Sequence, residues 1–213
     1  MIKDEDDIIF ENLVWHFCVG FRKFVIVDNN STDKTRSLIE KFRTQVMGKA
    51  TVIIVDDPIV EYIQSQVTTG AMRLADSIWP QLDWIFPVDA DEFWYPTINL
   101  REILSQIPVD NDIILTHQYN YTPINSADNY DFSLPFYDTL DYRYKSLPEG
   151  LGKVAVRAKH DMEIAQGNHS AHYLNYHKKT NCEAGNKLGL NMLHFPMRSV
   201  AQVEKKYWNG AKA

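Results

Sequence analysis

The sequence predicts an α/β fold, a mostly parallel sheet flanked by helices, from three apolar runs and the helical segments between them. Residues 23–27, 51–55 and 84–88 are short and rich in β-branched or aromatic side chains, as buried strands are. Residues 35–46 and 61–79 separate them and have helical periodicity. Strands that alternate with helices are typical of parallel sheets, because each crossover helix returns the chain to the same end.

Other helices are expected before and after this alternation. Residues 8–19 form an amphipathic helix that Gly20 ends, and Ser31 or Thr32 can cap the helix at 35–46. Asn99 can cap a short helix, and the tail from residue 199 is helical until Gly210.

The remaining strands are expected at 112–116 and 153–157. The segment 118–147 reads as a long loop or a small antiparallel excursion. Its aromatic side chains either stack on sugar rings or cover the edge of the core. We therefore expect one domain over residues 1–213, with a ligand-binding half at 1–95 and a second half, partly antiparallel, at 96–213.

Composition narrows the class of protein. The chain has 213 residues, 45% hydrophobic content and a formal charge of −6, without a block of Lys or Arg. A nucleic-acid backbone is thereby excluded as a partner. No apolar run approaches the ~18 residues of a membrane span. Cys18 and Cys182 lack the spacing of a metal or redox motif and indicate reduced thiols, hence a cytoplasmic setting.

The densest chemical signal is Asp89-Ala90-Asp91-Glu92, which follows the apolar run 84–88. Three carboxylates in four residues repel one another, so they need water, a cation or a basic partner to stay ionised. Their hard oxygen atoms favour Mg²⁺ or Mn²⁺, which commonly bridge one or two carboxylates to substrate phosphates. The alternative is a solvated turn after a strand.

Two other predicted strands also end in acid, at Asp28 and at Asp56-Asp57. Ligands of open α/β sheets bind outside the carboxyl ends of the strands. We therefore expect these carboxylates and the Asp89–Asp91 group to line one rim, which would hold a ligand with hydroxyls at one end and phosphates at the other.

Four motifs in this order resemble those of family 2-like glycosyltransferases with the GT-A (Rossmann-like) fold. The resemblance is strongest to a bacterial group with an Asp-Asn-x-Ser-Thr-Asp-x-Thr loop and an Asp-Ala-Asp-Glu-Phe metal motif. The matching elements are Lys3-Asp4-Glu5, Asp28–Thr35, Asp89–Phe93 and His194–Ser199. They span almost the whole chain, so the set is more specific than any one of them.

The resemblance implies a nucleotide-diphosphate sugar as donor, with UDP as the first candidate, and Mn²⁺ or Mg²⁺ as cofactor. Asp91 would be the main metal ligand, Asp89 would reach the ribose or the metal through water, and His194 would complete the metal site. The residues that it places near the donor are Lys3, Glu5, Asp28, Asn30, Asp57, Asp89, Lys153 and Arg198. The reaction would transfer the sugar to a glycan or lipid-linked acceptor, with inversion.

An inverting displacement needs a base near the acceptor hydroxyl. Asp161, Glu163 and His169 stand at a suitable place in the chain order, although each is compatible with an ordinary surface role. A zinc site at His169, His172 and His177 is a further alternative, but spacings of three and five match no familiar ligand pattern.

Other classes stay open on the sequence alone. A strand that ends in Asp-x-Asp also describes metal-dependent phosphatases and phosphotransferases, but Phe93 stands where those enzymes usually have Thr or Val. Nucleotidyl transfer on a similar sheet would need a Gly-rich loop with Arg and Lys near the first strand, and the sequence has none. A catalytically inactive sugar-binding relative is the third alternative.

The resemblance also has consequences for assembly. Relatives carry a full apolar strand before the Lys-x-Glu element, whereas Met1 and Ile2 alone precede Lys3. We therefore expect an open sheet edge that association or an alternative pairing covers. A homo-oligomer and peripheral contact with a membrane are both compatible with the sequence.

Overall fold

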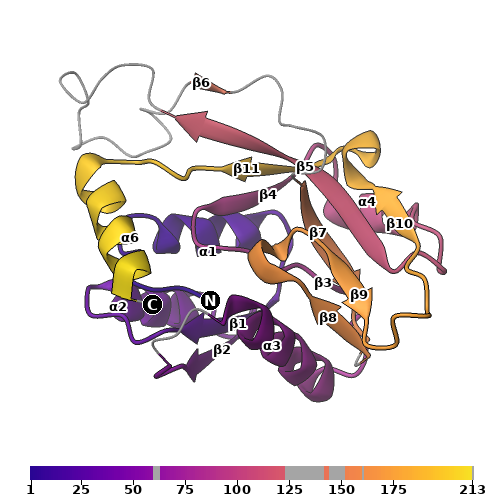
Figure 1. Ribbon diagram of the computed structural model, residues 1–213, viewed down its shortest axis with the longest axis horizontal. Helices are drawn as coiled ribbons and strands as arrows, with labels where there is room; N and C mark the ends of the chain where they lie inside the picture. Colours follow the sequence, from indigo (N-terminus) through magenta and orange to yellow (C-terminus); the bar gives the residue numbers. More distant parts are fainter. Residues whose placement is uncertain (60–62, 123–141, 144–151, 160, 213) are drawn as a thin grey trace.

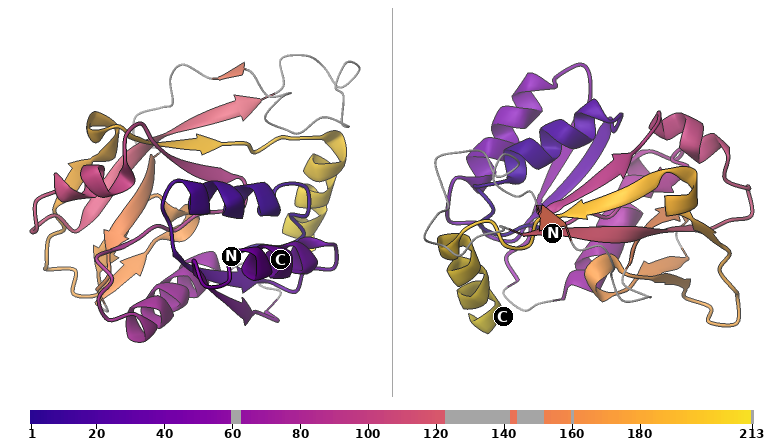
Figure 2. Two further views of the ribbon diagram at one scale, coloured as in Figure 1. Left: turned by 180° about the vertical axis from the view of Figure 1, so that it is seen from behind. Right: turned by 90° about the horizontal axis from the view of Figure 1, so that it is seen from above.

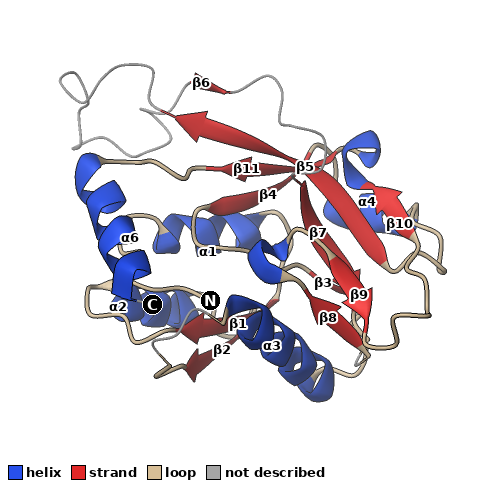
Figure 3. Ribbon diagram, in the orientation of Figure 1, coloured by secondary structure: helices blue, strands red, loops and turns tan. Residues whose placement is uncertain are grey.

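The computed structural model describes residues 1–59, 63–122, 142–143, 152–159 and 161–212 (Figure 1). The α/β class that the sequence predicts is confirmed, with helices and strands interleaved through the chain (Figure 3). The helices are α1 (Ile9–Cys18), α2 (Thr35–Gln45), α3 (Gln64–Ile78), α4 (Leu100–Ser105) and α6 (Val200–Lys212), with short 3-10 helices η2 (Gln166–Asn168) and η3 (Gly185–Leu188). The strands are β1 (Lys23–Asp28), β2 (Thr51–Asp56), β3 (Trp84–Ile85), β4 (Glu92–Pro96), β5 (Ile113–Thr122), β6 (Tyr142–Arg143), β7 (Gly152–Arg157), β8 (Met162–Ile164), β9 (Ala171–Tyr173), β10 (Cys182–Ala184) and β11 (Leu190–His194).

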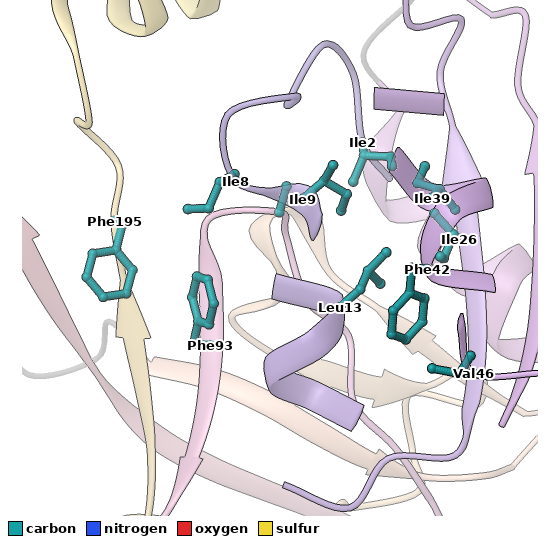
Figure 4. Close-up of a cluster of buried hydrophobic side chains, with 11 residues drawn as sticks. Ile2, Ile8, Ile9, Leu13, Ile26, Ile39, Phe42, Val46, Phe93 and Phe195 are labelled. Carbon is teal, nitrogen blue, oxygen red and sulfur yellow. The ribbon is translucent and has the colours of Figure 1, made fainter. Parts of the chain in front are cut away.

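The amino-terminal layer is built on a parallel pair. β1 and β2 pair from Lys23↔Thr51 to Asp28↔Asp56, as the strand–helix alternation predicts. Ile26 of β1 packs with α1 and α2 in one buried apolar cluster, which also includes Leu13 and Phe42 (Figure 4). The same cluster contains Phe93 and Phe195, so apolar contacts join this layer to β4 and to the end of β11.

The larger sheet is mixed. Its order is β3-β7-β5-β11-β4, and β5 also pairs with β10 and β6. β11 runs parallel to β5 but antiparallel to β4, and β7 is antiparallel to both β3 and β5. The predicted parallel pairing is thus present at β1 and β2, and antiparallel pairs predominate in the second half, which the sequence predicts to be partly antiparallel. Within the described residues from β7 to β11, no α-helix separates consecutive strands, and a parallel return of the next strand would require such a crossover.

The β1 edge facing β3 carries a single bridge among the described residues. Ile2 pairs with Asp28 in parallel: its N–H donates to Val27 O and its carbonyl accepts from Asn29 N, both at 2.8 Å. Cavities of about 160 and 120 Å³, both lined by Val25, adjoin this edge. The expected open edge is thus present in the described part of the chain.

The predicted strand at 84–88 is shorter than expected. Only Trp84 and Ile85 form a ladder, and the backbone from Phe86 to Val88 has no strand pairing in the described residues. Strand β5, by contrast, continues to Thr122, well past the predicted end at 116. The predicted loop or excursion at 118–147 therefore begins as strand, and apart from β6 the rest of it lies outside the described residues.

Some of the predicted helix caps and ends agree with the structure and others do not. The Asn99 cap is confirmed, because its Oδ1 accepts from Arg101 N at 3.0 Å. The predicted cap of α2 by Ser31 or Thr32 is wrong: Asp33 Oδ1 accepts from Thr35 N at 2.8 Å. Ser31 instead serves the amino-terminal segment, since its Oγ accepts from Asp4 N at 3.0 Å. Helix α6 runs past Gly210 to Lys212.

Candidate metal and nucleotide site

A cavity of about 540 Å³ opens at the end of β1 and at the turn after Val88. Its walls come from the amino-terminal segment, this turn, η2, the end of β11 and α6, which Figures 1 and 2 show around the same end of the sheet. The polar side chains on its lining are Lys3, Asp4, Glu5, Asn29, Gln64, Asp89, Asp91, Glu92, Gln118, Lys153, His169, His194, Gln202, Lys205 and Lys206.

The acidic turn is held through its backbone by Asn12 of α1. Asn12 Nδ2 donates to Ala90 O at 2.9 Å and to Glu92 O at 2.6 Å. The turn closes on itself, because Glu92 N donates to Asp89 O at 3.1 Å and Asp89 N donates to Glu92 Oε2 at 3.1 Å. The carboxylates therefore stand on a backbone that the first helix fixes.

Three of the lining residues form a candidate metal centre. Asp91, Glu92 and His194 offer ligand atoms that all lie within 4.8 Å of one another. The pairing of β4 with β11 explains this proximity, because Glu92 and His194 are direct partners in the antiparallel ladder. Two carboxylates and an imidazole suit a divalent cation such as Mn²⁺, so the residues present fit the cofactor that the resemblance implies.

The orientation of His194 agrees with this role. Its Nδ1 lies 2.7 Å from the amide groups of Gln118 and Asn120. The Asn120 oxygen pairs with a protonated Nδ1 and the Gln118 amide nitrogen with an unprotonated one, so the two contacts fix the direction of the ring and not its tautomer. The ring is directed with Nε2 toward the acidic turn, 3.5 Å from Asp91 Oδ1.

Asp91 is a buried carboxylate that its neighbours keep ionised. Burial by itself raises the pKa of this carboxyl, but His194 and Lys206 outweigh that effect and hold the pKa well below its usual range. Lys206 Nζ lies 2.9 Å from Asp91 Oδ2, and Arg198 Nη1 lies 3.7 Å from the same oxygen. Asp91 is therefore ionised at neutral pH and surrounded by cations.

Glu92 has the opposite character. Burial, with repulsion from Asp89 and Asp91, raises its pKa to about 8, although Lys153 offsets part of the increase. Lys153 is almost fully buried, and its Nζ lies 2.5 Å from Glu92 Oε1 and 3.7 Å from Asp89 Oδ2. A positive charge added to the site would favour the ionised form of Glu92.

Arg198 links the late motif to the amino terminus. It is buried, and its guanidinium donates to Glu5 Oε2 at 2.6 Å and to Asp7 Oδ2 at 2.8 Å. Burial raises the pKa of Glu5 to about 7, even though Arg198 acts against it. The first and last of the four sequence motifs thus meet in one ion-pair network.

The structure brings together part of the predicted donor-binding set. Lys3, Glu5, Asp89 and Lys153 line the cavity. Asp28, Asp57 and Arg198 are buried outside its lining: Asp28 faces Arg36, Asp57 bonds Asn29, and Arg198 lies beneath Glu5 and Asp91. Asn30 is exposed with φ +55°, and its neighbour Asn29 lines the cavity in its place.

Asp89 does not belong to the metal cluster of the described residues. Its Oδ1 accepts from Gln64 Nε2 at 2.9 Å, and its Oδ2 faces Lys153. Asp91 and His194 of the predicted metal set lie together, and Glu92 occupies the third place.

Of the three base candidates, His169 alone lines the cavity. Its Nδ1 lies 2.7 Å from Gly152 O, which requires a proton on Nδ1 and leaves Nε2 as an acceptor. Gly167, at φ +73°, makes room for this ring, since a Cβ there would stand 2.7 Å from His169 Cδ2. Asp161 is exposed and pairs with Lys178, and Glu163 faces His172 at 3.9 Å.

Several lining residues were missed by the sequence argument. Glu92 was visible as the third carboxylate of the turn, and Asn29 as the neighbour of Asp28 in the loop motif. No local sequence pattern indicates that Gln118 and Lys206 line the cavity, because long-range packing places β5 and α6. The three histidines of the zinc alternative form no such cluster within the described ranges.

The chain also matches a known protein family. A profile of "Glycosyl transferase family 2" matches residues 20–164, from just before β1 to the end of β8. No curated protein matches the chain. In the described part of the chain, no helix is long and apolar enough to cross a membrane. The profile covers more than half of the 213 residues and agrees with the α/β fold, so this chain belongs to glycosyl transferase family 2, with a GT-A fold.

Proposed function

We propose that the protein transfers a sugar from a nucleotide-diphosphate sugar to the hydroxyl of a glycan or lipid-linked acceptor, with a divalent cation at Asp91, Glu92 and His194. The observation that carries the proposal is this cluster on the wall of a 540 Å³ cavity, with the cations of Lys153, Lys206 and Arg198 around it. Such a volume suits a nucleotide-sized ligand.

The bound cation would supply charge neutralisation at the departing diphosphate, where negative charge develops as the glycosyl bond breaks. The chain's own residues prepare that place. Lys153 keeps Glu92 and Asp89 together, and Asn12 fixes the backbone of the turn. Gln118 and Asn120 hold the His194 ring with its Nε2 toward Asp91, so the ring already has the orientation that a ligand needs.

We propose His169 as the base of an inverting displacement. Its Nε2 would take the proton of the acceptor hydroxyl while that oxygen forms a bond to the anomeric carbon. The bond from the anomeric carbon to the phosphate oxygen breaks, and the diphosphate leaves with the electron pair. Its place on the cavity and the Gly152 contact support this choice over Asp161 and Glu163.

The nucleoside is proposed to lie toward Lys3, Glu5 and Asn29, at the rim formed by the end of β1. Lys3 Nζ donates to Asn29 Oδ1 at 3.4 Å, and Asn29 Nδ2 donates to Asp57 Oδ2 at 3.0 Å. Asp57 thus supports Asn29 from behind. Uridine nucleotides are the first donors to test.

A thermal-shift panel tests the proposal. Nucleoside diphosphates and nucleotide sugars are added with and without Mn²⁺, since a ligand that binds only the folded state raises the melting temperature. We expect at least one to stabilise the protein in a metal-dependent way, and Asp91→Asn to remove that dependence. Lys178→Met is the matched control, because Lys178 pairs with Asp161 away from the cavity lining.

A second assay separates the reaction classes. Release of nucleoside diphosphate from the stabilising donor is measured with and without simple glycoside acceptors, beside hydrolysis of a generic aryl phosphate. A transferase releases the diphosphate and leaves the aryl phosphate intact. If no donor stabilises the protein with Mn²⁺, or if the aryl phosphate is the better substrate, the proposal fails.

A further inference from the structure

Lys206 is a cation of the site that no sequence motif contains. It lies on α6, is about half exposed, and its Nζ is 2.9 Å from Asp91 Oδ2. The other oxygen of this carboxylate faces His194 Nε2 at 3.5 Å. The two oxygens of Asp91 are therefore divided between the candidate metal centre and a lysine from the carboxyl-terminal helix.

The neighbouring cations differ in their freedom to move. Arg198 is buried and held by Glu5 and Asp7, so its guanidinium is fixed in place. Lys206 has a flexible four-carbon stem and an exposed course to solvent, and Asp91 is its ion-pair partner among the described residues. A divalent cation bound at Asp91 would repel the side chains of both Arg198 and Lys206. Because Arg198 is fixed, Lys206 is the side chain that moves away.

The helix would keep the displaced ammonium near the cavity. Lys205, the preceding residue, pairs with Asp33 and with Asp6 at 3.5 Å. Gln202, one turn earlier, is buried, and its Oε1 accepts from Arg198 N at 3.2 Å. Helix α6 is thus anchored in the turn that precedes Lys206, and a small side-chain rotation leaves Nζ beside the cavity that it already lines.

We propose that Lys206 exchanges partners during the reaction cycle, an inference that rests on the proposed function. Without metal, it neutralises Asp91; with metal bound, it leaves Asp91 and donates to the diphosphate oxygens of the donor. A lysine suits this exchange because it is a compact charge with three donors and no fixed planar geometry. Lys206 is then a specificity residue for diphosphate over unphosphorylated ligands.

Calorimetric titrations of the full chain test this exchange. The variants are Lys206→Met, Lys206→Arg and Lys205→Met, and the titrants are Mn²⁺ alone, then UDP and uridine in the presence of Mn²⁺. For Lys206→Met we expect Mn²⁺ to bind several-fold more tightly, because no tethered cation competes for Asp91. UDP binding should weaken roughly tenfold, as expected for one lost charged hydrogen bond, while uridine binding stays unchanged.

The controls separate charge from helix packing. Lys205→Met removes ion pairs of the same helix with Asp33 and Asp6 but leaves the cation at Asp91, so Mn²⁺ affinity should not rise. Lys206→Arg should restore most of the UDP affinity. Opposite changes in metal and UDP affinity are the signature of the exchange, since loosening of α6 alone would weaken both.

The result distinguishes this inference from the proposed function. If the unmodified protein binds Mn²⁺ and UDP but Lys206→Met changes neither affinity, or weakens both, the exchange is wrong and the function stands. If the unmodified protein binds neither titrant, the proposed function fails together with the inference.

Discussion

Glu92 and His194 stand directly opposite each other in the antiparallel ladder of β4 and β11, and this pairing assembles the candidate metal centre. The strands that carry them lie in distant parts of the sequence, and the family profile ends before β11. The site therefore depends on a strand pairing and not on a local motif alone.

His194→Phe should weaken Mn²⁺ binding by at least about tenfold, because it removes the nitrogen ligand while the β4–β11 backbone pairing stays. Calorimetry gives the affinity, and circular dichroism confirms that the fold is kept. His172→Phe is the control, since His172 lies outside the cavity lining. An unchanged Mn²⁺ affinity in His194→Phe would exclude His194 as a ligand.

His16 should make the protein sensitive to mild acid. It is buried and neutral: Nδ1 donates to Asn12 O at 2.8 Å, and Nε2 accepts from Trp94 N at 3.3 Å. Burial lowers its pKa from 6.5 to about 4, despite the opposing effect of the Asn12 bond. The unfolded state therefore binds more protons between these values, so stability falls as pH drops from 6.5 to 4.

The contribution of His16 to this loss is about 3 kcal/mol over that interval. His16→Gln can keep both hydrogen bonds without titrating, so its urea midpoint should fall less steeply with acidification. His172→Gln, at a half-exposed histidine, serves as the reference. Parallel pH profiles for the natural protein and His16→Gln would contradict the prediction.

Lys153→Met should destabilise the fold by about 3 kcal/mol, because it leaves Glu92 and Asp89 without their buried cation. The loss should be larger at pH 9 than at pH 6, since Glu92, with a pKa already raised to about 8, escapes part of the cost by taking up a proton at the lower pH. Chemical denaturation at both pH values measures the difference. Equal losses at both would mean that Glu92 is not the group that Lys153 neutralises.

Amide exchange should report the open edge of β1. The backbone N–H and C=O groups of odd-numbered residues of β1 point toward β3, since Val27 O accepts from Ile2 N. Those of even-numbered residues point toward β2, since Arg22 O accepts from Thr51 N. We expect the amide protons of Val25 and Val27 to exchange faster than those of Phe24 and Ile26. Equal protection, measured by NMR, would show that another strand pairs with this edge in solution.

The sequence predicted those features that local pattern determines. The parallel pair β1–β2, the cap at Asn99 and the acidic turn all follow from residues within a few positions of one another. The resemblance added His194, which local pattern could not have connected to Asp91. The features that were not predicted depend on distant contacts. Ser31 accepts from Asp4 N instead of capping α2, and Lys206 reaches Asp91 because α6 packs on the amino-terminal segment.

Asn12 Nδ2 donates to two backbone carbonyls of the acidic turn, although Asn12 does not line the 540 Å³ cavity. A mutational survey scored on sugar transfer alone would rank Asn12 with the ligands, because a turn released from its amide no longer aims Asp91 and Glu92 at one point. In the proposed site, this amide outside the cavity lining would thus decide whether two acids act as a chelate or as two separate charges.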